Sequence, residues 1–127
     1  MTAEPRGAPA APGSGPAWTA LAREVAGVIP PAEILRLWVF PPLRRDDLEF
    51  GTAVVARQAP GERIRVYTAR VVRVVRGRER GQARVVMDDV AECPLAVVYD
   101  VLKGVQERMA ESEPPVEIPP TLWFGTP

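Results

Sequence analysis

The stretch RVVRVVRGRERGQARVV, residues 70–86, decides how this chain folds. Valines and arginines surround a short segment with two glycines, which is the pattern of two strands joined by a turn. The neighbouring residues extend the pattern to one strand over 63–76 and another over 82–90. Because only a few residues separate these strands, we expect them to pair antiparallel as a β-hairpin.

The register of the hairpin sorts its side chains onto two faces. With Arg76 placed opposite Gln82, Arg70 pairs with Asp88, and one face becomes apolar. That face holds Tyr67, Ala69, Val71, Val75, Ala83, Val85 and Met87. The other face is mixed and holds Arg70, Val72, Val74, Arg76, Arg84, Val86 and Asp88. We expect the apolar face to be covered by a helix.

A helix of the required kind follows the hairpin. Pro94 suits a first helical turn, and apolar residues then recur at spacings of three and four. They are Leu95, Val98, Leu102, Val105 and Met109. This stripe predicts an amphipathic helix that packs on the apolar face of the sheet.

Two further strands and a second helix precede the hairpin. Trp18, Leu21, Val25 and Val28 lie at helical spacing and predict a short helix that begins near residue 17. Residues 34–40 alternate as in a strand, although one helical turn after Pro31 is also compatible. Residues 48–57 form another candidate strand, in which Gly51 marks a bulge or the close approach of another backbone.

The sequence therefore predicts an α+β domain over residues 17–111. We expect a small antiparallel sheet of three to four strands, packed by the C-terminal amphipathic helix and preceded by the short N-terminal helix. Residues 1–16 are rich in Pro, Ala and Gly and predict a disordered or partner-ordered leader. Residues 112–127 predict an extended Pro-rich tail, which ends in an apolar anchor of sequence TLWF.

Charge is balanced over the 127 residues but unevenly placed along them. Residues 57–84 hold nine arginines against two glutamates, a net charge of +7, whereas residues 85–127 have a net charge of −6. Fifteen of the sixteen basic residues are arginine, which together with abundant Ala, Val, Pro and Gly indicates a GC-rich bacterial genome. The two halves either neutralise each other in the fold or form two faces of opposite sign.

Residue types that carry chemistry are scarce. The chain has no histidine, so the commonest general base and metal ligand is absent. The single Cys93 excludes an internal disulfide and fits a reducing cytoplasm. Asp88 and Asp89 are neighbours on a strand, so their side chains point to opposite faces and are poorly placed to share an ion. No apolar run is long enough for a membrane span. We expect no catalytic site, cofactor or metal.

These observations favour a non-enzymatic accessory or adaptor subunit that docks onto a larger protein assembly. The predicted partner-binding residues come from the C-terminal anchor and from the arginines at and beside the turn of the hairpin. They are Leu122, Trp123, Phe124, Arg73, Arg76, Arg78 and Arg80. The anchor can dock either on this protein's own sheet or in a groove of the partner, and we expect the partner because the Pro-rich spacer permits reach. The alternative function is a nucleic-acid-binding module that uses the Arg-rich hairpin 63–84, in which only Tyr67 is available for base stacking. The sequence leaves the oligomeric state open.

Overall fold

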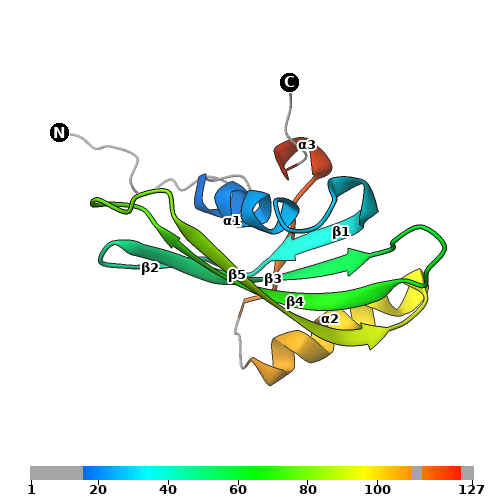
Figure 1. The fold of residues 1–127 in the computed structure, drawn as a ribbon. Coiled ribbons are helices and arrows are strands. Elements are labelled where there is room, and N and C mark those ends of the chain that lie inside the picture. Colours follow the sequence, from blue (N-terminus) through cyan, green and yellow to red (C-terminus); the bar gives the residue numbers. More distant parts are fainter. Residues whose placement is uncertain (1–15, 110–112, 124–127) are drawn as a thin grey trace.

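A six-stranded sheet forms the centre of the fold, with helices on both of its faces (Figure 1). The computed structural model describes residues 16–109 and 113–123. The strands are β1 Ile34–Val39, β2 Leu43–Arg45, β3 Leu48–Arg57, β4 Arg65–Val74, β5 Ala83–Glu92 and β6 Val116–Glu117. The helices are α1 Pro16–Ala26, α2 Val98–Arg108 and α3 Pro120–Trp123, with 3-10 turns at Pro31–Glu33 and Leu95–Val97. The strand order is β5-β4-β3-β1-β6, β2 pairs with β3, and the pairs are antiparallel.

The central strand β3 is buried on both faces, which explains its unbroken apolar run from residue 53 to 56. Ala53 and Val55 pack in the cluster beneath α1, and Val54 and Ala56 pack in the cluster beneath α2. Since successive strand residues point to opposite faces, both parities must be apolar where helices cover both sides. The fold is therefore a three-layer arrangement with two separate apolar clusters.

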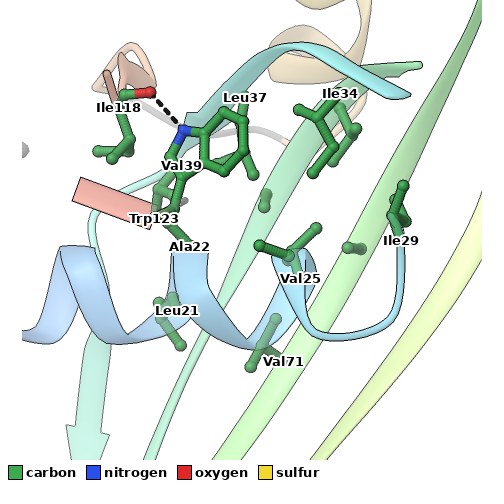
Figure 2. Close-up of a cluster of buried hydrophobic side chains, with 14 residues drawn as sticks. Leu21, Ala22, Val25, Ile29, Ile34, Leu37, Val39, Val71, Ile118 and Trp123 are labelled. Atoms are coloured by element: carbon green, nitrogen blue, oxygen red, sulfur yellow. Dashed lines mark hydrogen bonds between the residues drawn. The ribbon is translucent and has the colours of Figure 1, made fainter. Parts of the chain in front are cut away.

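The larger cluster lies between α1 and the sheet (Figure 2). Leu21, Ala22 and Val25 of α1 are buried there against strand residues that include Leu37 and Val71. Helix and sheet are so close that a Cβ atom at residue 51 would lie 2.8 Å from Cδ1 of Leu21. Gly51 therefore marks a close approach, but the nearest neighbour is a side chain of α1 and not the backbone that the sequence suggested.

The second cluster lies between α2 and the opposite face. The middle of the predicted helical stripe is buried, with Val98, Leu102 and Val105 packed among residues that include Trp38 and Phe40. The stripe ends outside the core, since Leu95 and Met109 are exposed. The prediction of an amphipathic C-terminal helix is confirmed for residues 98–108.

The arrangement of the helices differs from the prediction. The apolar hairpin face, represented by Ala69, Val71 and Val85, packs under α1, whereas α2 covers the other side of the sheet. The hairpin register is also offset, because Arg70 pairs with Val86 and not with Asp88. A shift of two residues keeps every side chain on its predicted face, so the sorting into faces was correct although the register was wrong.

The sheet has six strands and not three to four because two short strands were missed. β2 forms between the strands predicted over 34–40 and 48–57, and it pairs with the start of β3. β6 forms in the predicted tail, where Val116 pairs with Val39 of β1. Ile118 follows it and is fully buried, so the folded unit continues beyond residue 111. Within residues 16–109 and 113–123, no helix has the length and apolar character needed to cross a membrane.

Candidate docking surface

Part of the α2 side of the sheet has no helix over it among the described residues. α2 lies under the end of the sheet where β3 finishes and β4 begins, and the end that carries β2 extends beyond it (Figure 1). On this uncovered part, cross-strand pairing places Leu43 beside Phe50 and Phe50 beside Val72. We call the set the distal face: Leu43, Leu48, Phe50, Val72 and Val74.

The distal face is apolar and accessible. Leu43, Leu48 and Val72 are among the exposed large apolar residues, and Phe50 and Val74 are half-buried. A hollow of about 310 Å³ runs over this surface and is lined by residues that include Leu43, Phe50 and Val72. Contiguous exposed apolar surface of this kind is typical of sites where proteins contact one another.

A second hollow continues the first towards the end of α2. It measures about 540 Å³, and it shares Thr52, Arg70 and Met109 with the hollow over the distal face. Arg108 near the end of α2 also lines it. The two hollows therefore form one groove that has an apolar end at Leu43 and a polar end at Arg108.

Of the four predicted basic residues, Arg73 is engaged inside the fold. Its guanidinium contacts the carboxylate of Glu49, which is 7% exposed, and lies 3.6 Å from the carboxylate of Glu24 on α1. Arg73 thus joins the sheet to α1 on the side opposite the distal face. It is positioned to stabilise the packing of the helix, and a partner would have to break this contact to use it.

The remaining three lie at the tip of the sheet. Arg76 is exposed, with its Nε 3.3 Å from Asp47 and its Nη2 donating to the backbone carbonyl of Asp46. It therefore ties the β4–β5 loop to the turn after β2. Arg78 and Arg80 are exposed in that loop, and neither forms an ion pair with another residue of the described ranges.

Most of the cations that form no ion pair within the described part of the chain lie at this tip, and the others, Arg23, Lys103 and Arg108, lie on α1 and α2. The five at the tip belong to β2, to the β4–β5 loop and to the start of β5: Arg44, Arg45, Arg78, Arg80 and Arg84. The cross-strand pairs of Arg45 and Arg84 place both on the α2 side of the sheet, beside Leu48 and Val72 of the distal face. The distal face is therefore apolar with a basic border.

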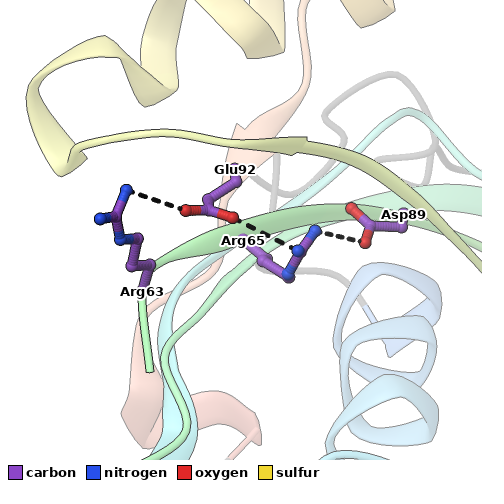
Figure 3. Close-up of polar contacts among 4 residues, drawn as sticks. All are labelled: Arg63, Arg65, Asp89 and Glu92. Atoms are coloured by element: carbon purple, nitrogen blue, oxygen red, sulfur yellow. Dashed lines mark hydrogen bonds and ion pairs between the residues drawn. The ribbon is translucent and has the colours of Figure 1, made fainter. Parts of the chain in front are cut away.

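The other end of the hairpin is neutralised by ion pairs (Figure 3). Glu92 lies 3.3 Å from both Arg63 and Arg65, and Arg65 also bonds Asp89 at 2.7 Å. Arg70 lies 3.6 Å from Asp88 in the middle of the hairpin. The Arg-rich hairpin is thus no continuous basic strip, because its arginines from 63 to 76 face carboxylates.

The C-terminal anchor packs on this protein itself. Trp123 is 4% exposed in the α1 cluster, and its indole Nε1 donates to the backbone carbonyl of Ile118 at 2.8 Å (Figure 2). Leu122 is half-buried against the same cluster, and its carbonyl accepts a hydrogen bond from Arg23 of α1. Phe124 lies outside the described residues. Of the two docking modes compatible with the sequence, the structure has the internal one for Trp123 and not the expected docking on a partner.

Clusters suited to metal chemistry are not found in the described ranges, where no three Asp, Glu, Cys or His side chains gather. The carboxylates of Asp88 and Asp89 form ion pairs with different arginines, Arg70 and Arg65, because neighbouring residues on a strand point to opposite faces. Cys93 is half-buried beside the α2 cluster. The geometry at these three positions is accounted for by packing and ion pairing.

No family model matches this chain, and comparisons with curated proteins and with solved structures find no match. The assignment of the distal face as a docking surface therefore rests on the geometry of this structure alone.

The sequence indicated only part of the distal face. The mixed face of the hairpin already contained Val72 and Val74, which are unusual on a solvated side. The contribution of Leu43 could not be found, because it depends on the short strand β2. The length of sheet left uncovered depends on where α2 ends, at Arg108.

Proposed function

We propose that this chain is a non-enzymatic accessory or adaptor subunit that docks onto a larger protein assembly through the distal face. The observation that carries the proposal is the exposed apolar surface beyond the end of α2, bordered by arginines. Helices cover most of the apolar sheet surface elsewhere, and the exposed large apolar residues of β2, β3 and β4 all belong to this one surface. In a protein without a partner there, polar residues at positions 43 and 72 would avoid the exposure of apolar surface to water.

The chemistry of the border specifies the partner. The distal face would accept aliphatic and aromatic side chains, while Arg45 and Arg84 beside it would attract carboxylates around them. Such an arrangement separates the roles usual in protein interfaces, with an apolar centre for affinity and charges at the rim for orientation and association rate. The partner surface is therefore expected to be apolar at its centre and acidic at its edge.

The test is an affinity pulldown from the native organism with nuclease present. Leu43→Glu combined with Val72→Glu should reduce the retained protein partner about tenfold or more, because each change places a carboxylate in the apolar centre. The matched control is Val28→Glu combined with Leu95→Glu, which alters equally exposed apolar residues elsewhere; Leu43 and Val28 are 62% and 56% exposed. Equal loss in both double variants, or no loss in either, would contradict docking through the distal face.

Nucleic-acid binding is a second candidate function because five arginines at the tip have no carboxylate partner in the described ranges. It uses fewer cations than the sequence indicated, since Arg63, Arg65 and Arg70 are paired. The same pulldown separates the two candidates. Material that is lost when nuclease is added would favour nucleic acid, and material that persists would favour a protein partner.

A further inference from the structure

β5 leaves one edge of the sheet open. It is the last strand in the order β5-β4-β3-β1-β6, and within the described ranges no other strand pairs with its outer side. β5 has ten residues, whereas the opposite edge is formed by the two-residue strand β6. A long open edge presents a row of backbone donors and acceptors that can pair with another chain.

The backbone of β5 shows which residues present these groups. The N–H of Val74 donates to the carbonyl of Gln82 at 2.8 Å, and these two residues stand opposite each other, one step beyond the cross-strand partners Arg73 and Ala83. Antiparallel strands alternate between hydrogen-bonded and non-hydrogen-bonded pairs, so the even-numbered residues of β5 bond to β4. The outward-facing backbone groups therefore belong to Ala83, Val85, Met87 and Asp89.

We propose that a second copy of this chain pairs antiparallel along β5, with the two-fold axis at Val86. In this register the segment RVVMD, residues 84–88, is complementary to itself. Arg84 stands opposite Asp88 of the second copy, and Val85 stands opposite Met87 of the second copy. Val86 meets its own equivalent at the axis.

The side chains support this pairing. Arg84 is exposed and has no ion-pair partner in the described ranges, and the Asp88 carboxylate is 60% exposed and lies 3.6 Å from the guanidinium of Arg70. Val86 is an exposed aliphatic residue on a strand edge. The dimer would form two symmetric Arg84–Asp88 pairs and would bury Val86 against Val86.

Registers displaced towards the C-terminal end of β5 are less favourable. Displacing the axis to Met87 places Val85 and Val86 opposite carboxylates, and displacing it to Asp88 places two aspartates opposite each other. The proposed pairing uses residues 83–89, which end before the irregularity in the β4–β5 ladder opposite Val66 and Tyr67. The backbone agrees as well, since Val85 and Met87 direct their N–H and C=O groups outward and would exchange hydrogen bonds with each other.

Pairing of this kind has a consequence for docking. The two-fold axis is perpendicular to the sheet, so the same face of both copies lies on the same side. Both distal faces would then point in one direction, and the dimer would present two docking surfaces to one assembly. This inference does not rest on the proposed function, because it concerns the β5 edge and is measured on the purified protein. In the dimer Arg84 pairs with Asp88 of the second copy, which leaves Arg45 to attract carboxylates at the border of the distal face.

The first test measures the molar mass of the purified chain over a range of concentrations. The wild type should show a reversible monomer–dimer equilibrium. Arg84→Glu should raise the dimer dissociation constant about tenfold or more, because it replaces two attractive pairs with two repulsive ones. Arg84→Glu combined with Asp88→Arg should restore dimerisation by exchanging the charges. A wild type that is monomeric at every soluble concentration, or a double variant that is not restored, would overturn the pairing.

The second test identifies the axis. Residues of a non-hydrogen-bonded antiparallel pair have Cα atoms about 4.5 Å apart, which is within the range that a disulfide spans. Val86→Cys, in a background that carries Cys93→Ala, should therefore form a disulfide-linked dimer under mild oxidation. Val72→Cys in the same background is the matched control, because Val72 and Val86 are 39% and 40% exposed. If both cysteine variants cross-link to the same extent, the two-fold axis is not at Val86.

Discussion

At the scale of single residues, the same residue type serves opposite purposes on this sheet. Arg73 is held by Glu49 and Glu24 between the sheet and α1, whereas Arg78 and Arg80 extend from the tip without a carboxylate partner in the described ranges. The sequence grouped these arginines because they are neighbours along the chain. Period-two alternation does place Arg73 and Glu49 on one face, but their pairing depends on the β3–β4 register, which the sequence did not provide.

The Arg73–Glu49 contact yields a stability prediction. Arg73→Met keeps most of the aliphatic stem but leaves the buried Glu49 carboxylate without its closest cation. We expect a loss of roughly 2 kcal/mol in the free energy of unfolding, below the full cost of breaking a completely buried pair because Arg73 is partly exposed. Denaturant unfolding measures the loss, with Arg78→Met as the control that should stay within about 0.5 kcal/mol of the parent. Equal stability of the two variants would show that the Arg73 contact is no more than a surface pair.

At the scale of elements, long periodic segments were predictable and short ones were not. β3, β4 and β5 have ten residues each, and α1 and α2 have eleven, so their hydrophobic periods are expressed several times. β2 and β6 have three and two residues, too few to show a period, and they exist because β3 and β1 offer free edges. The face covered by α2 was mispredicted because the apolar stripe of a helix does not specify which side of a sheet it meets.

The C-terminal elements β6 and α3 give a prediction at this scale. Ending the chain after Pro115 removes the strand that pairs with β1, together with the buried Ile118 and Trp123. Loss of a buried tryptophan alone costs about 3–5 kcal/mol. Because 1 kcal/mol shifts the melting temperature of a domain of this size by about 4–8 °C, we expect a decrease of more than about 10 °C.

A milder variant separates packing from hydrogen bonding at this position. Trp123→Phe keeps an aromatic ring in the α1 cluster but removes the indole donor that bonds the Ile118 carbonyl. Its expected cost is about 1 kcal/mol for the hydrogen bond, with a further contribution from the smaller ring. Thermal melts of the two variants should therefore rank Trp123→Phe well above the truncated chain. A truncated chain that melts with the parent would show that Trp123 does not dock in its own core.

At the scale of the whole molecule, folding resolves the charge asymmetry that the sequence left open. The basic segment before residue 84 and the acidic segment after it run side by side as β4 and β5, so part of their charge is neutralised between them. Five arginines without an ion pair in the described ranges lie at one tip, next to the distal face, and the opposite end of the hairpin carries the Arg63, Arg65, Asp89 and Glu92 network. The composition alone could not show this, because net charge says nothing about which strands become neighbours.

This distribution predicts weak binding of nucleic acid. Each phosphate contact to duplex contributes a slope of about −0.9 to the dependence of log affinity on log salt, so five arginines at the tip give at most a moderate slope. We expect no binding tighter than micromolar at physiological salt, because a single-strand site would also need aromatic residues among the cations, and the β4–β5 loop has none. Fluorescence anisotropy with labelled single-stranded and duplex oligonucleotides over a salt series measures both quantities. A nanomolar affinity that is lost when Arg44, Arg45, Arg78 and Arg80 are replaced by alanine would make the tip a nucleic-acid site and would reverse the order of the two candidate functions.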